Sequence, residues 1–410
     1  MLPLDFFFRG KLLINRYIIH NVGGKLLNNF VVGPSICMSS LCYSIFKLEP
    51  YQGCAYSCVY CYARNFPGGK LLRVKTNYTK LFEKLATKLK KSNLTNIPFR
   101  LSTLSDPFQK SEEIWKLSLK LLRICLRIKI PVIISTKSDL IVKEPWLTII
   151  KKLTEQKLVV IQYTLILLND EKSKIIEPKA PPPSKRLKAI EKLHDEGIPV
   201  IIRLQPIIPF VNSKEDFMET FVSTMKAIGA QQIIAENYRF TSWRELSIYQ
   251  ELIRPEEYKF LKDRSFWEYY PSASQKRPKV KFRIKTLTNL AKICEKHNLK
   301  YSTCREGLYH LHTSPNCCGM HNFGSYRLRP TLHEIWKNVN KFGSITIKRA
   351  CILLESQNKK IIEKIPLKIM QRTLNDHLNI LIRTLTNFRT LTAICPILRV
   401  ENNRIQSIDL

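Results

Sequence analysis

Residues 49–64 read Glu-Pro-Tyr-Gln-Gly-Cys-Ala-Tyr-Ser-Cys-Val-Tyr-Cys-Tyr-Ala-Arg and contain three cysteines, Cys54, Cys58 and Cys61. Three thiolates on one short loop can bind three irons of a cubane iron–sulfur cluster, and the fourth iron then lacks a protein ligand. Such an iron can bind a small molecule, whereas a fully ligated cluster mostly carries electrons. The alternatives are buried or disulfide-bonded cysteines and a zinc site, but zinc usually takes four ligands in paired Cys-x2-Cys units. The spacing therefore favours an iron–sulfur cluster.

Around this loop, short β-branched runs alternate with amphipathic helical patterns, which predicts parallel strand–helix units. The predicted strands lie near 44–48, 99–104, 131–136, 158–165, 199–205 and 231–236. The predicted helices lie near 78–91, 112–128, 146–155, 184–196 and 214–228. Residues 1–40 show no clear periodicity. The pattern of residues 250–297 predicts a mixture of helix and loop, and that of residues near 356–388 predicts a long helical stretch.

The chain has 410 residues, and its 44% hydrophobic content is ordinary for a folded globular protein. No apolar run approaches the ~20 residues of a membrane span, and no signal-type cleavage pattern follows the first residues. We therefore expect a cytoplasmic protein without a membrane segment. Twelve cysteines in such a chain favour metal binding or burial over a disulfide framework.

The net charge is strongly positive, because 67 Lys and Arg residues face 33 Asp and Glu residues, giving +34. Such a charge favours polyanionic partners, of which nucleic acid is the commonest. The alternative is a compositional bias toward Lys and Ile from an AT-rich genome, since the basic residues are spread along the chain. Nucleic acid is thus one of two interpretations of the charge.

The cysteine loop resembles the CX3CX2C motif of the radical S-adenosylmethionine (radical SAM) superfamily, with Tyr60 before the last cysteine. The longer stretch resembles one branch, the spore photoproduct lyase-like or "DNA repair photolyase" family, although Glu49 stands where that family usually has Asn. Further segments over roughly 42–240 resemble the same family in order and spacing. They are Ser105-Asp106-Pro107-Phe108-Gln109, Ser135-Thr136-Lys137-Ser138, Glu177-Pro178-Lys179-Ala180-Pro181 with Arg186, Gly197-Ile198-Pro199, and Arg203-Leu204-Gln205-Pro206-Ile207-Ile208-Pro209.

The resemblance implies an α/β fold, a partial open (β/α)6 barrel of the TIM type over residues 42–250, with chemistry at the C-terminal ends of the strands. We expect an N-terminal extension at 1–41 and a basic segment with a Cys/His-rich loop at 251–342. A mostly helical C-terminal tail is expected at 343–410.

The resemblance also implies a [4Fe–4S] cluster on the three cysteines and S-adenosylmethionine (SAM) as a second cofactor. An electron from an external flavodoxin- or ferredoxin-like reductant would cleave SAM to a 5′-deoxyadenosyl radical that takes a hydrogen atom from the substrate. The expected SAM-binding residues are Tyr60, Ser105, Asp106, Lys137, Thr164 and Arg203. Structural alternatives remain open, namely a helix cap for Asp106, a solvated strand end for Lys137 and an ion pair for Arg203.

One position departs from the resemblance in a way that bears on the chemistry. Spore photoproduct lyases carry a hydrogen-donor cysteine two residues before the Ser-Asp pair, whereas this chain has Thr103. A hydroxyl cannot donate a hydrogen atom as a thiol can, so the catalytic residue and the exact reaction are unknown from the sequence. Radical modification of a peptide or small metabolite, and a non-catalytic iron–sulfur protein that binds nucleic acid, are the alternative functions.

A second group of metal-ligating residue types lies within 304–321, where the glycines and proline of a loop can surround an ion. Its candidate ligands are Cys304, Cys317, Cys318 and His321. The interpretations are zinc, a second iron–sulfur cluster, or a structural group of thiols, because adjacent cysteines on one metal are strained.

Overall fold

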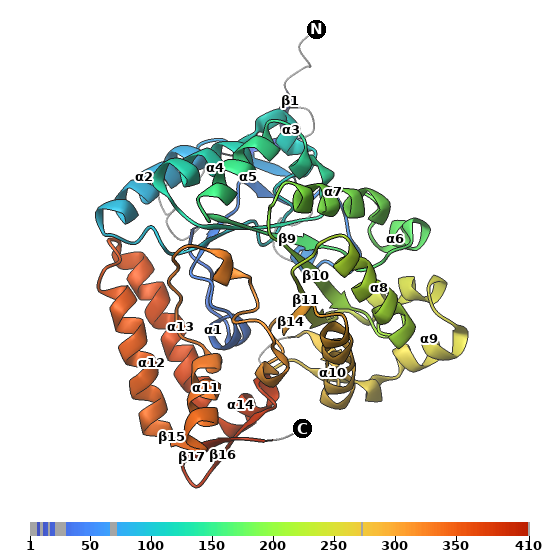
Figure 1. The fold of residues 1–410 in the computed structure, drawn as a ribbon, viewed down its shortest axis with the longest axis vertical. Helices are drawn as coiled ribbons and strands as arrows, with labels where there is room; N and C mark the ends of the chain where they lie inside the picture. The colour runs from blue at the N-terminus through green and yellow to red at the C-terminus, as the bar shows by residue number, and fades with distance from the viewer. Residues whose placement is uncertain are drawn as a thin grey trace. The chain divides into compact units, whose positions relative to one another are not determined.

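The structure, a computed structural model, describes residues 6–8, 11–14, 17–20, 30–65, 72–271 and 274–408 (Figure 1). The chain forms two compact units that are interleaved in sequence. The first comprises residues 46–200 and 322–327 with the described residues up to 32. The second comprises residues 33–45, 201–321 and those from 328 onward.

The first unit contains a parallel sheet in the strand order β9-β8-β7-β4. The strands are β4 (Phe46–Leu48), β7 (Phe99–Leu101), β8 (Val132–Thr136) and β9 (Val159–Thr164). All six residues of β9 are buried, as expected for a parallel strand covered on both faces. The register pairs Phe46 with Phe99 and Phe99 with Val132, so the strands begin at one level and their C-terminal ends lie at one edge.

Helices follow these strands in the chain, and all but the short helix at 170–176 were predicted from the sequence. They are α2 (Tyr78–Lys91), α3 (Ser111–Trp115), α4 (Leu117–Ile128), α5 (Trp146–Glu155), α6 (Asp170–Ile176) and α7 (Pro183–Asp195). The single helix predicted near 112–128 is wrong in one respect, because it is divided into α3 and α4 at Lys116. That residue adopts a left-handed conformation with φ +49°, which interrupts the helical hydrogen bonds.

A second sheet of the first unit lies in the order β1-β2-β3-β6-β5. Its strands are β1 (Phe6–Phe8), β2 (Lys11–Ile14), β3 (Tyr17–His20), β5 (Tyr51–Gln52) and β6 (Arg73–Lys75). Residues 1–40 showed no periodicity because three-residue and four-residue strands are too short to display one. β5 matters for the site because it leads directly into the cysteine loop.

The second unit contains three parallel strands in the order β14-β11-β10. They are β10 (Val200–Ile207), which begins at the unit's boundary, β11 (Gln232–Asn237) and β14 (Lys300–Thr303). Helices α8 (Glu215–Ala227), α9 (Pro255–Lys262) and α10 (Val280–Lys296) lie between them in the chain. The six predicted strands are confirmed, and β14 is an additional strand that the sequence analysis did not predict. The α/β class, with parallel strands and intervening helices, is therefore confirmed.

The rest of the second unit is mostly helical, as predicted for the C-terminal tail. The helices are α1 (Ile36–Leu41), α11 (Leu332–Phe342), α12 (Ile347–Ile362), α13 (Lys368–Thr386) and α14 (Phe388–Ile394). A small sheet accompanies them, in the order β15-β17-β16 (Ser344–Thr346, Arg404–Ser407 and Leu398–Glu401). The single helix expected near 356–388 is wrong. Two helices are separated around Pro366, whose ring removes a backbone donor and ends α-helices.

Among the described residues, no helix is both long enough and apolar enough to cross a membrane. The four predicted segments, 1–41, 42–250, 251–342 and 343–410, stay predictions.

Candidate active site

The cysteine loop follows β5 at the C-terminal side of β4, in the first unit. Cys54, Cys58 and Cys61 are all free, and Cys58 is buried while the other two are partly exposed. Gly53 (φ +78°) and Ser57 (φ +54°) turn the backbone on either side of Cys54. The Cys61 N–H donates to the Cys58 carbonyl at 3.2 Å, which closes the turn between the last two cysteines. The loop therefore presents three thiols from one short, hydrogen-bonded segment.

Two neighbouring segments hold this loop in place. The Val59 N–H donates to the Ile176 carbonyl at 2.9 Å, and the Lys179 N–H donates to the Tyr56 carbonyl at 3.3 Å. On the other side, the buried Gln109 side chain accepts from the Ala55 N–H at 2.8 Å and donates to the Gly53 carbonyl at 3.1 Å. Gln109 thus fixes the backbone on both sides of Cys54. The sequence analysis quoted Gln109 within a family segment but gave it no role.

A buried ionic group lies beside Cys58. Arg186 Nη1 is 2.6 Å from Glu177 Oε2, and these two side chains are 0% and 1% exposed. Lys137 Nζ is 3.9 Å from the other oxygen of Glu177, which also accepts a hydrogen bond from the Tyr60 hydroxyl. Two cations therefore face one carboxylate, which leaves a net positive charge next to the cysteine loop.

The pKa values in this group follow from burial and from these charges. Burial raises the pKa of the Cys58 thiol to about 11, and Lys137 opposes that shift. Burial raises the pKa of Cys54 to about 12. Burial alone would also raise the pKa of Glu177, but Arg186 and Lys137 outweigh it and lower that pKa below its ordinary value. Cys54 and Cys58 without metal are thus protonated at neutral pH, and iron binding must release their protons.

Lys137 is one of the residues that the sequence analysis expected to bind SAM. Its side chain is 16% exposed, and its Nζ lies 5.5 Å from the centre of the Tyr60 ring. Burial would lower the pKa of Lys137, but Cys58 and Glu177 raise it, so the ammonium stays charged. The structure therefore brings Lys137, Tyr60 and Cys58 together, and the predicted role of Lys137 in SAM binding stays a prediction.

Asp106 is buried, and both its oxygens accept hydrogen bonds from the protein. Oδ1 accepts from the Phe108 N–H at 2.9 Å and the Thr136 hydroxyl at 2.8 Å, and Oδ2 accepts from the Lys137 N–H at 2.7 Å. Burial raises the pKa of this carboxyl, and the hydrogen bonds oppose that rise. Asp106 thus joins the segment after β7 to the end of β8, and its predicted role in SAM binding stays a prediction.

The segment after β7 is anchored by Glu49, one of the two family departures. Glu49 accepts from the Thr103 N–H at 2.5 Å, from the Thr103 hydroxyl, and from the Ser102 hydroxyl at 2.8 Å. The Thr103 carbonyl in turn accepts from the Tyr62 hydroxyl at 2.7 Å, directly after Cys61. The other departure, Thr103, is therefore in direct contact with Glu49 and close to the cysteine loop.

The remaining predicted SAM residues lie in different surroundings. The Ser105 hydroxyl donates to the Tyr51 carbonyl at 3.2 Å, and buried Thr164 ends β9. Arg203 lies on β10 in the second unit, where its charge acts on the Cys304 thiol. Their roles in SAM binding stay predictions.

The second group of cysteines lies entirely in the second unit. Cys317 and Cys318 are buried with their sulfurs 3.5 Å apart. Burial raises the pKa of the Cys304 thiol to about 12. His321 is beside Lys300, and burial and that charge lower its pKa. Within the described part of the chain, no three His, Cys, Asp or Glu side chains are arranged to hold one metal ion. A cubane cluster differs, because each thiolate binds a different iron. The second metal site stays a prediction.

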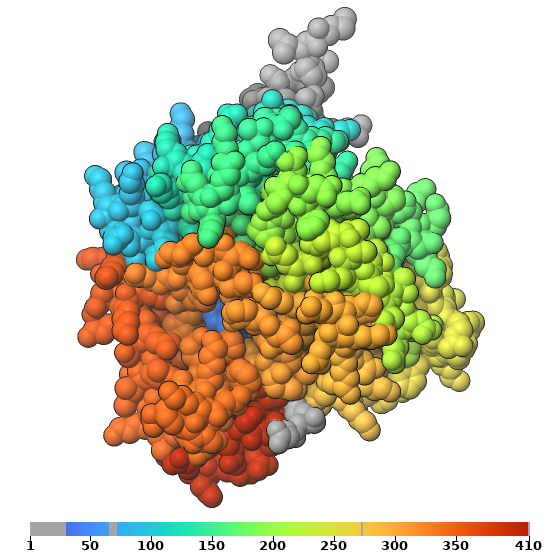
Figure 2. Space-filling model, viewed as in Figure 1, coloured from blue at the N-terminus to red at the C-terminus, as the bar shows by residue number. Residues whose placement is uncertain are grey.

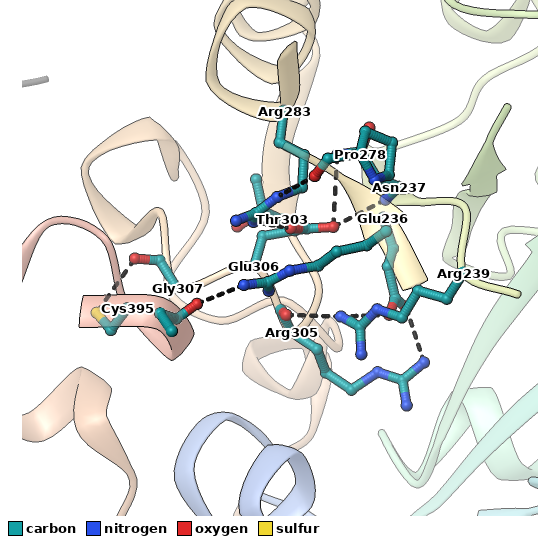
Figure 3. A network of polar contacts seen from close by, with 12 residues as sticks. Glu236, Asn237, Arg239, Pro278, Arg283, Thr303, Arg305, Glu306, Gly307 and Cys395 are labelled. Atoms are coloured by element: carbon teal, nitrogen blue, oxygen red, sulfur yellow. Dashed lines mark hydrogen bonds and ion pairs between the residues drawn. The ribbon is translucent and has the colours of Figure 1, made fainter. Parts of the chain in front are cut away.

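A polar network that the sequence analysis did not predict fixes the residues at the start of this Cys/His-rich loop (Figure 3). Arg305 and Arg239 both bind Glu236 at the end of β11, at 2.8 and 3.1 Å. Glu306 accepts from the Asn237 N–H at 2.9 Å and pairs with Arg283 at 2.7 Å. These bonds hold the residues just after β14, so they also hold Cys304. Apart from Glu236 and Arg239, which lie three residues apart, no local pattern reveals these bonds, because the partners are far apart in sequence.

Residues 48–222 match the family model of the Radical SAM superfamily, over the cysteine loop and the strands that surround it. This segment of the chain is similar to the radical SAM superfamily. Its resemblance to the superfamily, predicted from the cysteine loop, is confirmed.

Curated relatives carry no functional description in their names. One is the "Uncharacterized protein ORF301" of Acidianus two-tailed virus, 27% identical over 202 residues, which are 45% of this chain and 64% of that protein. Another is the "Uncharacterized protein MJ0683" of Methanocaldococcus jannaschii, 27% identical over 246 residues, which are 55% of this chain and 82% of that protein. The match thus spans less than two thirds of the viral relative.

Among solved structures, the chain is similar to a spore photoproduct lyase double mutant with bound AdoMet and dinucleoside spore photoproduct. The TM-score is 0.50 at 14% identity, covering 63% of this chain and 76% of that one. A second spore photoproduct lyase mutant gives the same TM-score at 15% identity. At such identities the likeness shows a shared fold, in agreement with the predicted α/β barrel type.

Proposed function

We propose that this protein is a radical SAM enzyme that binds a [4Fe–4S] cluster through Cys54, Cys58 and Cys61 and cleaves SAM reductively. The observation that carries the proposal is the position of the largely buried, charged Lys137 next to Cys58 and Cys61, in a loop of three free cysteines. Thiolates are the ligands that iron–sulfur clusters prefer, and a nearby cation favours the thiolate form. The residues present therefore fit the cluster.

When bound, the cluster supplies the electron that cleaves SAM, and the resulting 5′-deoxyadenosyl radical takes a hydrogen atom from the substrate. The chain's own residues orient the cofactor. Lys137 provides a point charge for the SAM carboxylate, and the Tyr60 ring provides an apolar surface for the adenine. Glu177 and Arg186 hold both of these side chains. Ser105, Asp106, Thr164 and Arg203 complete the proposed SAM-binding set.

We propose a nucleic acid as the substrate class. The net charge of +34 supports this proposal, and so does the dinucleoside bound to the structurally similar lyase. The proposed reaction does not use Thr103 as a hydrogen donor, because its hydroxyl is bound to Glu49 and its O–H bond is too strong. The product radical must then take its hydrogen atom from another group or from 5′-deoxyadenosine.

The proposed reaction requires an external one-electron reductant of the flavodoxin or ferredoxin type. We also propose a cytoplasmic location. All twelve cysteines are free, as expected in a reducing compartment, where thiols persist.

The first test is anaerobic formation of 5′-deoxyadenosine by reconstituted, dithionite-reduced protein, followed by mass spectrometry. We expect product with the native chain and none with Cys58→Ala. Cys125→Ala is the matched control, since Cys125 is buried in α4, away from the loop. A cluster-loaded protein that does not bind SAM would contradict the proposal. Substrate is then sought by adding DNA or RNA to the same assay.

A further inference from the structure

The outer face of α2 and α4 in the first unit concentrates positive charge far beyond the average of the chain. Residues 78–91 and 116–129 together carry ten exposed cations and one acidic residue, Glu83. The whole chain has 67 basic and 33 acidic residues, a ratio of about two to one. The cations are Lys80, Lys84, Lys88, Lys90, Lys91, Lys116, Lys120, Arg123, Arg127 and Lys129. A compositional bias alone would give these two helices the same ratio of basic to acidic residues as the rest of the chain.

The two helices pack side by side (Figure 1), and a groove of about 340 Å³ runs between them. Its lining is Thr79, Lys80, Glu83, Lys120, Arg123, Ile124 and Arg127. Four of these seven residues are cations and one is acidic. We call this surface the α2–α4 groove.

The spacing of the cations along α4 matches a repeating anion. Lys120, Arg123 and Arg127 are three and four residues apart, so they lie along one face of the helix. At ~1.5 Å per residue this row spans ~10 Å. The phosphates of one DNA strand advance by ~3.4 Å per nucleotide along the duplex axis and lie further apart along the winding backbone, so the row can face about two successive phosphates.

Other polyanionic partners fit this surface less well. Protein interfaces are built around aromatic and apolar anchors, and helices that lie on membranes insert apolar side chains. None of the large hydrophobic side chains exposed among the described residues lies on α2 or α4. The lining of the α2–α4 groove is instead polar and cationic, with Ile124 buried beneath it.

We propose that the α2–α4 groove binds the phosphate backbone of a nucleic acid. Lys120 and Arg123 contact phosphates directly, and Arg127 is partly neutralised by its ion pair with Glu83. This inference concerns a surface on the outside of the barrel, and it holds whether or not the proposed radical chemistry is correct.

The experiment is binding of a fluorescent 20-base-pair duplex DNA by the reconstituted full-length protein, without SAM, followed by anisotropy between ~50 and ~200 mM salt. The test variant is Lys120→Gln/Arg123→Gln. The control is Lys185→Gln/Lys188→Gln, which removes the same charge from exposed residues at the same spacing on α7. Circular dichroism melting establishes that each variant is folded.

Each phosphate contact contributes ~0.9 to the slope of log affinity against log salt, so the groove variant should lower that slope by ~1.8. Its loss of affinity between ~50 and ~200 mM salt should therefore be ~12-fold smaller than that of the native chain. The α7 control should keep the native slope. Glu83→Gln should strengthen binding several-fold, because it removes the one acidic group and releases Arg127. A gain of affinity cannot result from misfolding.

Equal slopes for the groove variant and the α7 control would overturn the proposal, because the charge would then act diffusely. Weaker binding by Glu83→Gln would also overturn it. If the groove variant binds DNA normally but loses affinity for anionic vesicles or for an acidic electron carrier, the surface serves that partner and the proposal is wrong.

Discussion

The ion pair between Arg186 and Glu177 gives the sharpest test of the site, through the substitution Arg186→Met. The two side chains are 0% and 1% exposed and 2.6 Å apart, so removing the cation leaves a carboxylate buried with its charge uncompensated. Lys137, at 3.9 Å, compensates only in part. Breaking a buried pair from one side costs about 3–5 kcal/mol. Methionine retains most of the volume, so little of this loss comes from a cavity.

The assay is urea unfolding at pH 7, followed by circular dichroism. We expect Arg186→Met to lower the free energy of unfolding by about 3–5 kcal/mol, and we expect Glu177→Gln/Arg186→Met to recover part of that loss. The matched control is Lys151→Met, which breaks a solvent-accessible pair with Glu196 at 2.5 Å and should cost much less than the buried pair. A loss at Arg186 as small as at Lys151 would refute the reasoning.

The pH dependence adds a second check on the same pair. The pKa of Glu177 is lowered in the folded chain, so the pair contributes fully above the ordinary glutamate pKa of ~4.3. That contribution is lost only as the pH falls through the lower, folded value. The contribution of the pair in the native chain should therefore stay constant from pH 7 to pH 5. In Arg186→Met the carboxylate has lost its main counter-charge, so its pKa rises and protonation at lower pH restores part of the lost stability; the difference between the two chains should shrink as the pH falls. An identical difference at pH 7 and pH 5 would show that the buried carboxylate is compensated without Arg186.

Three further predictions concern single side chains. Lys137→Met should keep the iron content of the native chain but weaken SAM binding by about 10–100-fold, since a charge-assisted hydrogen bond contributes about 1.5–3 kcal/mol. Calorimetric titration measures the affinity for SAM. Unchanged affinity would show that Lys137 does not bind SAM. Gln109→Ala should reduce the iron bound per reconstituted chain, because the backbone beside Cys54 loses both hydrogen bonds to the Gln109 side chain. The control variant is Asn96→Ala, which removes an exposed hydrogen bond, and iron analysis compares the two. Burial lowers the pKa of His312 to about 3, and its ring lies 2.9 Å from the Thr303 hydroxyl. Below the ordinary histidine pKa of ~6.5 the unfolded chain therefore binds a proton at His312 that the folded chain does not bind. The free energy of unfolding should fall by up to about 1.4 kcal/mol per pH unit from there toward pH 3. Urea midpoints at pH 7, 6 and 5 should depend less on pH in His312→Gln.

The sequence predicted the elements whose residues are local in the chain. The amphipathic pattern of Tyr78–Lys91 and of Trp146–Glu155 gave helices with the observed bounds, because the buried positions repeat with the helical period. The parallel strands β4, β7, β8, β9, β10 and β11 were predicted from β-branched runs, since parallel strands are buried on both faces. Lys116 divides a helix that the pattern predicted as continuous, because a left-handed residue leaves no apolar signature.

The candidate active site could be predicted only where its functional residues lie close together in the sequence. The cysteine spacing indicated the cluster, and the resemblance placed Lys137 near it. The Glu177–Arg186 pair and the double anchor at Gln109 were not predicted as contacts. Gln109 and the loop beside Cys54 come from separate strand–helix units. Glu177 ends α6 and Arg186 lies on α7, and only the folded chain brings their side chains together.

The contact between Glu49 and Thr103 limits the order in which these two positions can change. A thiol is a weak hydrogen-bond donor, so Thr103→Cys alone would leave the buried Glu49 carboxylate with one strong donor fewer. Replacing Glu49 with Asn alone would leave the Thr103 hydroxyl and backbone N–H with a weaker acceptor. Each single substitution therefore gives a less favourable contact between positions 49 and 103, whereas the double substitution gives the pair of residues seen in the lyase-like family. Any route between the two kinds of enzyme, in a lineage or in a directed-evolution library, should therefore pass through both changes together.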